Sequence, residues 1–363
     1  PVGVATNMIV DGREVLVPMA TEESSVVAAV CNAAKRCRGT GGFFTSGSGP
    51  VMAAQIQLLG VSDPENVRLK VYERFEEIRT ICDETDPLLV KFGGGFRDLE
   101  VRVIETDEGP MTIVHIIVDT RDAMGANAVN SMAEALAPKL AEWTGARTLL
   151  RILTNLADRR VVRARAVWPL DEIGGAQVRD DMLSAYRFAD ADPYRAATHN
   201  KGIMNGVSAV VLATGNDTRA IEAGAHAFAA RTGRYRSMSR WEKDAEGNLV
   251  GILEMPMAVG LIGGATKVHP TAQANLKLLG VQTADALARV IVAIGLAQNF
   301  AAMRALATTG IQKGHMALHA QNVALMVGAV GDEIDLVASE LKVLGKVRQD
   351  LAEDILKRIR GGQ

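Results

Sequence analysis

Three charged residues near the middle of the chain have the types and spacing of a site for an anionic ligand. ATHNKGIMNG (197–206) includes Lys201, and ATGND (213–217) ends in Asp217. Arg195 lies six residues before the lysine. An aspartate can keep an ammonium charged in a dry site, and an arginine suits a carboxylate or phosphate group. Because glycines occur in both segments, we expect the three charges on adjacent loops; for the lysine alone, an ordinary surface turn is the alternative.

Two further segments carry groups that could transfer protons. In TEESS, Glu23 stands at an expected helix start before the apolar run VVAAV, where desolvation could hold its carboxyl protonated as a general acid. The alternative is the ordinary preference for acidic residues in a first helical turn. In GHMALH, His315 and His319 share a helix face. Since HExxH and a convincing third ligand are absent, we expect His315 to donate a proton and no metal to bind.

The segment DAMGAN (122–127) joins an expected strand to an expected helix and could hold a nucleotide. A glycine at a helix start lets a phosphate or amide group reach the free N–H donors. The segment is not the dinucleotide-binding GxGxxG fingerprint, which occurs nowhere in the chain. An ordinary capped helix start is equally compatible with the pattern.

Composition and charge describe the molecule that must position these residues. The chain has 363 residues, of which 48% are hydrophobic, and its 40 basic and 42 acidic residues give a net charge of −2. This balance leaves no electrostatic footprint for coating nucleic acid or an anionic membrane. Three cysteines without CxxC spacing exclude a disulfide scaffold and a thiolate zinc site, and we expect neither a signal peptide nor a membrane span. A cytoplasmic location follows.

The order of the expected elements predicts an α+β fold. Residues 51–168 alternate as strand, helix, two strands joined by a DEG turn, helix and strand, which is the β-α-β-β-α-β or ferredoxin-like arrangement. Its helices are expected over 64–82 and 126–143. The remaining elements are a short extended piece at 14–17, a helix over 21–37, a Gly/Ser-rich turn up to Pro50, mostly helices with turns at Gly202, Gly206 and Gly215, a long apolar helix over 283–307, and terminal helices over 315–327 and 332–360.

Taken in order and spacing, EESS, DAMGAN, THNKGIMNG, TGND and GHMALH resemble the family of 3-hydroxy-3-methylglutaryl-CoA (HMG-CoA) reductases, in particular the class II enzymes of prokaryotes. The resemblance covers essentially the whole chain. It implies a large, mainly helical substrate domain (1–50 and 160–309), an inserted ferredoxin-like NAD-binding domain (51–159) and a small C-terminal helical flap (310–363). It also implies an obligate homodimer, or an assembly of dimers, with active sites shared between subunits.

The family's reaction converts HMG-CoA to mevalonate and free CoA by two hydride transfers from a nicotinamide nucleotide, and it runs in reverse in some members. By motif match, the resemblance implies that Glu23, Lys201, Asp217 and His315 are catalytic. Lys201 would stabilise the carbonyl oxygen as negative charge develops, and Asp217 would hold the lysine. Glu23 would supply a proton to the aldehyde oxygen, and His315, on a closing flap, would protonate the departing CoA thiolate. Mevalonate metabolism is the implied role.

The resemblance also implies binding residues. Substrate contacts would be Arg195 to the terminal carboxylate, with Ser25, Asn205 and Asn299 as hydrogen-bonding neighbours. Nicotinamide and phosphate contacts would be Asp122, Met124, Gly125 and Asn127.

Asp86, in ETDPLL, matches the position that faces the adenosine ribose. A carboxylate accepts hydrogen bonds from a 2′-hydroxyl but repels a 2′-phosphate, so we predict NADH over NADPH.

Family members carry an N-terminal helical segment with an ENVIG-type motif that contributes to substrate binding, and residue 1 follows the place where it would lie. Whether the 363 residues are active without that segment is therefore a further question. The alternative function is a non-catalytic protein of the same fold that binds a CoA thioester or a nucleotide. Loss of a catalytic residue would mark such a protein, but all four are present.

Overall fold

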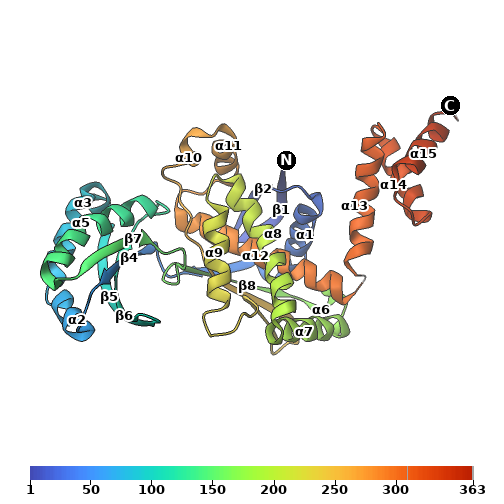
Figure 1. Cartoon of the computed structure of the whole chain (residues 1–363). Helices are drawn as coiled ribbons and strands as arrows, with labels where there is room; N and C mark the ends of the chain where they lie inside the picture. Colours follow the sequence, from blue (N-terminus) through green and yellow to red (C-terminus); the bar gives the residue numbers. More distant parts are fainter. Residues whose placement is uncertain (309, 362–363) are drawn as a thin grey trace.

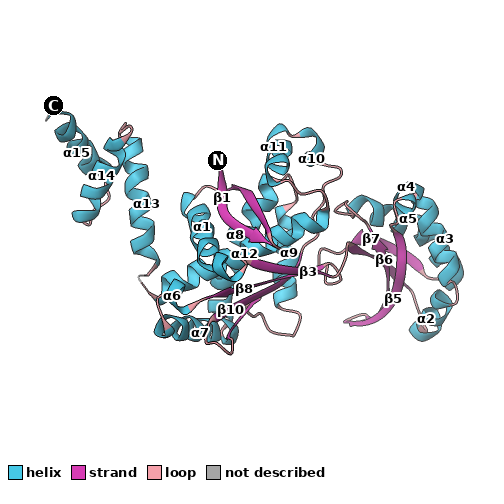
Figure 2. Ribbon diagram, turned by 180° about the vertical axis from the view of Figure 1, so that it is seen from behind, coloured by secondary structure: helices cyan, strands magenta, loops and turns pink. Residues whose placement is uncertain are grey.

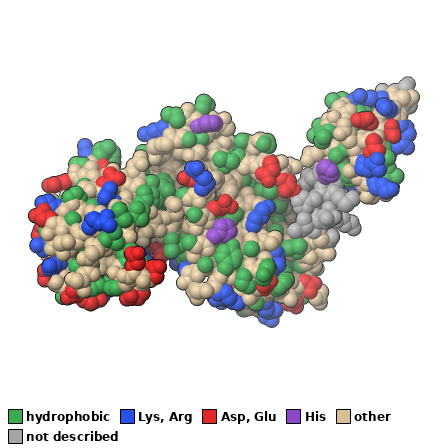
Figure 3. Space-filling model, viewed as in Figure 1, with side chains coloured by type: hydrophobic (Ala, Val, Ile, Leu, Met, Phe, Trp, Pro, Cys, Tyr) green, Lys and Arg blue, Asp and Glu red, His purple; other side chains and the backbone are tan. Residues whose placement is uncertain are grey.

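The computed structural model describes residues 1–308 and 310–361, and the side chains of all of these except 311–318. Three regions follow one another across the molecule (Figure 1). A central body (residues 1–47 and 161–308) lies between a side region (residues 48–160) and the C-terminal helices (residues 310–361). Lys and Arg are interspersed with Asp and Glu over the visible face of the molecule (Figure 3), as the near-zero net charge implies.

The central body is built on a six-stranded sheet with the order β2-β1-β3-β8-β10-β9. Adjacent strands in this sheet are antiparallel, except that β1 and β3 are parallel to each other. The strands are β1 (Val2–Val10), β2 (Arg13–Ala20), β3 (Phe43–Gly47), β8 (Val161–Trp168), β9 (Ser239–Lys243) and β10 (Leu249–Pro256). The helices of this body are α1 (Ser24–Cys37), the 3-10 turn η1 (Arg38–Thr40), α6 (Leu170–Ile173), α7 (Ala176–Ala191), α8 (Pro193–Ala213), α9 (Thr218–Ala229), α10 (Ala265–Val268), α11 (Pro270–Leu279) and α12 (Ala284–Ala307).

The chain leaves the central body and returns to it through neighbouring strands. β3 and β8 pair antiparallel, with Gly47 opposite Val162. Beyond this pair, the Ser48 N–H donates to the Val161 carbonyl at 3.0 Å, and the Val161 N–H donates to Ser48 Oγ at 2.9 Å. The side region is therefore an insertion into the central body, and hydrogen bonds join the segments that enter and leave it.

The side region is an antiparallel sheet with helices packed on one face (Figure 2). Its strand order, β5-β6-β4-β7, is that of the ferredoxin-like arrangement, so the predicted β-α-β-β-α-β order and the α+β class are confirmed. Residues of β4 alternate between buried and half-buried, as expected for a strand with one covered face. The elements are β4 (Val51–Leu59), α2 (Pro64–Tyr72), α3 (Phe75–Thr85), α4 (Pro87–Lys91), β5 (Gly95–Thr106), β6 (Gly109–Asp119), α5 (Ala126–Thr144) and β7 (Arg147–Leu153).

Two long helices, α8 and α12, cross at the centre of the molecule. A Cβ on Gly206 of α8 would lie 3.0 Å from Ile294 Cγ2, and one on Gly295 of α12 would lie 2.8 Å from Val207 Cγ2. These glycines let the two helix backbones approach closely. The prediction of turns at Gly202 and Gly206 was therefore wrong, because both residues lie inside α8; Gly215, with φ of +72°, does lie in the turn after that helix.

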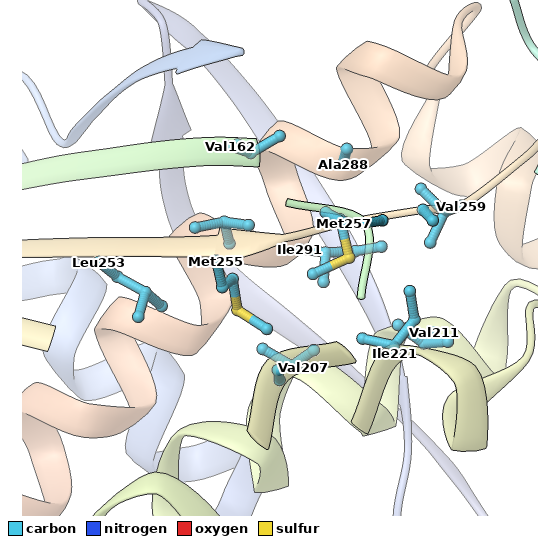
Figure 4. Close-up of a cluster of buried hydrophobic side chains, with 14 of the residues drawn as sticks. Val162, Val207, Val211, Ile221, Leu253, Met255, Met257, Val259, Ala288 and Ile291 are labelled. Atoms are coloured by element: carbon cyan, nitrogen blue, oxygen red, sulfur yellow. The ribbon is translucent and has the colours of Figure 1, made fainter. Parts of the chain in front are cut away.

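Helix α12 is the core helix of the central body. Thr283 caps its N-terminus by accepting the Ala286 N–H at 3.1 Å, and most of its residues are buried. By length and hydropathy the helix could cross a membrane, but 78% of its most apolar window is buried inside the protein. Apolar side chains from β8, α8, α9 and β10 meet α12 in the cluster of Figure 4.

The C-terminal helices form a separate small core. They are α13 (Ile311–Met326), α14 (Asp332–Val343) and α15 (Gln349–Gly361), so the single charged helix predicted over 332–360 is broken at Leu344–Arg348. Among the described side chains, Ala324, Val337 and Leu341 pack with Ile355 in this core.

Other differences from the predicted elements have identifiable causes. The helix predicted over 64–82 divides at Glu73–Arg74, and Asp63 caps its first part by accepting the Asn66 N–H at 3.0 Å. The extended piece predicted at 14–17 belongs to a longer hairpin of β1 and β2. Strands β3, β9 and β10 were missed. The pairings of β3 and β10 with β8 are distant in the sequence, so tertiary context decides them, whereas β9 and β10 form a local hairpin that the sequence reading overlooked.

Candidate functional site

The first candidate group is the carboxylate of Glu23, between β2 and α1. Glu23 occupies the N-cap position of α1, and its backbone carbonyl accepts the Val26 N–H. The Ser25 hydroxyl donates to Glu23 Oε1 at 2.5 Å. Both side chains are half-buried. The structure thus brings together two predicted site residues and gives the carboxylate a hydrogen-bond donor that orients it.

Arg195, Lys201 and Asn205 all lie on α8 rather than on loops. Asp192 caps this helix by accepting the N–H groups of Tyr194 and Arg195, and Pro193 occupies its first position. Lys201 is exposed and Asn205 is half-buried, and a spacing of four residues places them on one helix face.

The predicted pairing of Lys201 with Asp217 does not form within one chain. Asp217 caps α9, accepting the N–H groups of Arg219 and Ala220 at 3.0 and 3.2 Å. It also forms an ion pair with Arg219 at 3.1 Å, and this side-chain bond lowers the pKa of the Asp217 carboxyl. Since α8 runs without a break from Lys201 to Ala213, the helix separates the lysine from the TGND turn by about 18 Å.

Asn299, a predicted substrate contact, lies in a buried hydrogen-bond network. Its side chain is 1% exposed, and its Oδ1 accepts from Trp241 Nε1 at 2.9 Å and from Ser239 Oγ at 2.8 Å. His199 faces Ser239 Oγ and Ser237 Oγ at 2.9 Å, and Asn299 Nδ2 at 3.3 Å. Burial lowers the pKa of His199 to about 4, so this histidine is neutral at physiological pH. The network fixes α8 against β9 and α12.

The DAMGAN segment forms a tight turn at the N-terminus of α5. Gly125, the N-cap residue, has φ of +106°, and a Cβ there would lie 2.6 Å from Thr120 Cγ2. Only glycine fits this position. Asp122 Oδ1 accepts the Ala284 N–H at the start of α12 at 2.7 Å, so the turn is tied to the core helix. Met124 is half-buried and Asn127, in the first turn of α5, is exposed.

A family model described as hydroxymethylglutaryl-coenzyme A reductase matches residues 1–320, which include every predicted catalytic motif. The chain belongs to this family.

Known members of the HMG-CoA reductase family resemble the chain over almost its whole length. The 3-hydroxy-3-methylglutaryl-coenzyme A reductase of Archaeoglobus fulgidus is 55% identical over 360 residues, which cover 99% of this chain and 82% of that relative. A probable reductase of the same name from Borreliella burgdorferi is 34% identical and is covered to 84%.

Among solved structures, the class II HMG-CoA reductase of Streptococcus pneumoniae bound to NADPH superimposes with a TM-score of 0.83 at 42% identity. The match covers 99% of this chain and 88% of that chain. The predicted family and its class II likeness are confirmed.

Asp86 lies between α3 and α4 in this reductase family member. It caps α4 by accepting the Leu89 N–H on Oδ1 at 3.0 Å, and it is half-buried. Beyond the C-terminal end of α4, Arg97 and Arg121 both donate to the Gly93 carbonyl. Both guanidinium groups also form ion pairs with Asp119, at 3.3 and 2.8 Å.

Sequence reasoning missed Arg160 as a residue of this region. Its side chain is buried and donates hydrogen bonds to the DAMGAN turn, although the sequence shows it only as one of several arginines in DRRVVRAR. Burial of one arginine at the start of a strand that carries exposed arginines depends on which segments pack there. No local pattern could have distinguished it.

His315 lies in α13, but its side chain falls outside the described residues. His319, one turn later, is exposed. Across the side chains that the structure does describe, no group of three or more His, Cys, Asp or Glu is arranged to hold a metal ion.

Proposed function

We propose that the chain interconverts HMG-CoA with mevalonate and free CoA, using two successive hydride transfers from NADH. The observation that carries this proposal is the match of one reductase family model to residues 1–320, which hold Glu23, Lys201, Asp217 and His315 in family order. We assign the substrate to residues 1–50 and 160–309, the nucleotide to residues 51–159, and the closing flap to residues 310–363. The cytoplasm is the proposed location.

The turn at the start of α5 fits a nicotinamide nucleotide. Its Gly125 cannot carry a side chain without meeting Thr120, and the first N–H groups of a helix of 19 residues attract phosphate or amide oxygens. Asp122, Met124, Gly125 and Asn127 are the proposed contacts. When bound, the nucleotide supplies the hydrides.

The protein's own side chains would manage the charge and the protons. The Lys201 ammonium, directed at the thioester carbonyl oxygen, would stabilise the negative charge that grows on it in the transition state. Glu23, oriented by the Ser25 hydroxyl, would deliver a proton to the aldehyde oxygen in the second reduction. His315 would protonate the CoA thiolate so that it cannot add back to the aldehyde. Arg195 and Asn205 would hold the substrate, with Ser25 beside them.

The geometry of α8 supports a site shared between two subunits. Lys201 and Asp217 are kept apart by about 18 Å of continuous helix, yet the proposed chemistry needs them together. A two-fold dimer brings Lys201 of one subunit to Asp217 of the other, because an isologous contact joins different parts of one surface. Asp217 would then exchange its bond to Arg219 for one to the lysine.

The surroundings of Asp86 support NADH as the preferred nucleotide. A free arginine near the ribose would favour a 2′-phosphate, but Arg97 and Arg121, which contact Gly93 beyond the C-terminal end of α4, are both paired with Asp119. The S. pneumoniae relative was solved with NADPH bound, so the nucleotide preference of this chain needs its own test. We expect NADH to give the higher kcat/KM in parallel kinetics. An NADPH preference that Asp86→Ala leaves unchanged would contradict the assignment.

The activity itself is tested by following nicotinamide absorbance with HMG-CoA, for wild type and Lys201→Ala. Two molecules of NADH oxidised per HMG-CoA, and no oxidation by the variant, are the expected results. Binding of HMG-CoA and nucleotide without turnover, by a chain that includes any residues preceding Pro1, would instead favour the non-catalytic binding protein.

A further inference from the structure

The guanidinium of Arg160 lies buried where the side region meets the central body. Arg160 is 4% exposed and stands just before β8. Its Nη1 donates to Thr120 Oγ1 at 3.2 Å and to the carbonyls of Ala123 and Met124 at 3.1 Å. Its Nη2 donates to the Val259 carbonyl at 2.6 Å. One cation therefore joins the DAMGAN turn to the segment that follows β10.

All four of these acceptors are neutral. Within residues 1–308, no carboxylate forms an ion pair with Arg160, so hydrogen bonds compensate for its burial, together with the more distant charges of Asp119, Asp122 and Asp285. Burial lowers the pKa of its guanidinium to about 10, which leaves the group charged at neutral pH. A buried charge satisfied by backbone carbonyls is costly to misplace, so it holds those carbonyls in a defined geometry.

The segment after β10 is itself firmly placed. Met257 and Val259 point into the apolar cluster beside Val211 and Ile221 (Figure 4). The Met257 N–H donates to the Arg160 carbonyl at 3.0 Å. This segment is thus a fixed part of the central body.

The same segment connects the two motifs proposed to bind substrate and nucleotide. The Gly260 N–H donates to Asn216 Oδ1 in the TGND turn at 2.8 Å, and the Leu261 N–H donates to the Asp122 carbonyl at 2.8 Å. A Cβ on Gly260 would lie 2.5 Å from the Met124 backbone nitrogen. The turn that contains Asp217 and the turn that contains Asp122 are therefore joined through one short segment. Arg160 adds to this connection, because it donates hydrogen bonds both to the turn that contains Asp122 and to this segment.

We propose that Arg160 is a positioning residue that sets the nucleotide-binding turn at a fixed distance from the substrate residues of the central body. The inference rests on the proposed function and adds to it a residue that touches neither ligand. Arg160 acts through the carbonyls of Ala123 and Met124, which orient Gly125 and the open N-terminus of α5. Because hydride transfer requires reacting atoms at close approach, a small shift of this turn weakens nucleotide binding and alignment.

Only an arginine can fill this role. The planar guanidinium presents five N–H donors in a rigid fork and reaches acceptors on two segments at once. A lysine keeps the charge but offers three donors on one atom, so it cannot bridge Thr120, Met124 and Val259 together.

The test compares Arg160→Lys with Arg163→Lys in the full chain. Arg163 lies three residues later on β8, is largely exposed and pairs with Glu254, so its variant controls for a charge-conserving change close to Arg160. For Arg160→Lys we expect the KM for NADH to rise by at least about tenfold, with the KM for HMG-CoA within about twofold of wild type. Arg163→Lys should change neither constant.

Two results would overturn the inference: equal rises in both KM values, or no change in either the KM for NADH or kcat. If Arg160→Lys does not fold, Thr120→Val provides the measurement, since it removes one acceptor and keeps the side chain's shape; it should raise the NADH KM in the same direction by a smaller factor.

Hydrogen–deuterium exchange of amides 120–129 separates this inference from the proposed function. Faster exchange in Arg160→Lys than in Arg163→Lys, measured without any ligand, supports the positioning role even if wild type fails to reduce HMG-CoA. Equal exchange in the two variants overturns that role, whatever the activity.

Discussion

At the residue scale, burial separates side chains that can meet a substrate from those that support them. Asn205 and Asn299 were both predicted as substrate contacts from motif position. Asn205 is half-buried on the Lys201 face of α8, whereas Asn299 directs its oxygen at Trp241 and Ser239 inside the protein. Motif matching cannot make this distinction, because it carries no information on which side chains the fold buries.

Alanine substitutions at the two asparagines should therefore affect different properties, stability in one case and substrate binding in the other. Asn299→Ala leaves the Trp241 N–H buried without an acceptor, and we expect it to lower the free energy of unfolding by about 2 kcal/mol. Asn205→Ala should change that free energy by less than about 0.5 kcal/mol and instead raise the KM for HMG-CoA. Urea unfolding and steady-state kinetics on both variants decide the matter. An Asn299→Ala protein as stable as wild type, with only a raised HMG-CoA KM, would restore its role as a substrate contact.

His199 should make the stability of the protein depend on pH. Its folded-state pKa is about 4 against an ordinary value of 6.5, mainly because burial disfavours the charged form, with Arg195 adding to this effect and Asp190 opposing it. The unfolded chain binds this proton first as the pH falls. The stabilisation is therefore complete above about pH 6.5 and is lost between there and about pH 4, by about 3 kcal/mol.

Urea unfolding between pH 4 and pH 8 measures this loss. His199→Asn should flatten the slope in that interval, although it lowers stability at neutral pH, where the histidine is uncharged. His269→Gln, at an exposed histidine, is the control and should keep the wild-type slope. If the free energy of unfolding of the wild type does not decrease as the pH is lowered from 6.5 to 4, His199 is not held neutral.

At the scale of elements, the main error of sequence reasoning concerns glycine. Three glycines near Lys201 and Asp217 were interpreted as turns, but Gly202 and Gly206 lie inside α8 and only Gly215 ends it. A glycine in a helix costs stability, so it needs a reason. For Gly206 the reason is its contact with α12. A Cβ on Gly202 would meet no described atom of another element within 4 Å, and this open space beside Lys201 is where the proposed substrate would approach.

Alanine substitutions at helix glycines should have opposite effects. Gly202→Ala adds a methyl group in open space and should stabilise the free protein by about 0.5–1 kcal/mol while raising the KM for HMG-CoA. Gly295→Ala forces a Cβ to within 2.9 Å of both Val207 and Leu253 and should destabilise by about 1–3 kcal/mol. Thermal unfolding compares the two. Destabilisation by Gly202→Ala would mean that its neighbourhood is more crowded than the structure shows.

The elements that were predicted correctly are those with strong local signals. The ferredoxin-like order follows from alternating strands and amphipathic helices within 120 residues, and Thr283 marks the start of α12 as a standard cap. β3 could not be predicted in this way, because it pairs with β8 about 120 residues later, and β10 likewise pairs with β8 about 90 residues earlier; the hairpin of β9 and β10 is local and was overlooked. The contact of Asp122 with Ala284 likewise joins residues 162 positions apart.

At the scale of the whole molecule, the arrangement of the motifs is incomplete in one chain. Lys201 and Asp217 are 16 residues apart, and this closeness in the sequence suggested that they form a pair on adjacent loops. Most of the intervening residues continue α8 as far as Ala213, so closeness in sequence becomes separation in space. We therefore propose that the catalytic pair forms between two copies of the chain.

This requirement can be tested by mixing two inactive variants. Lys201→Ala and Asp217→Asn each remove one member of the pair, so each homodimer should be inactive. If the pair forms between subunits, a mixed dimer keeps one intact site, made from the lysine of the Asp217→Asn chain and the aspartate of the Lys201→Ala chain. When equal amounts of the two variants exchange subunits at random, half of the dimers are mixed, so about a quarter of wild-type activity should be restored. Lys201→Ala mixed with Lys201→Met is the control and should recover nothing. If the two residues acted within one chain, neither mixture would regain turnover, although size-exclusion chromatography would still show that the subunits had exchanged.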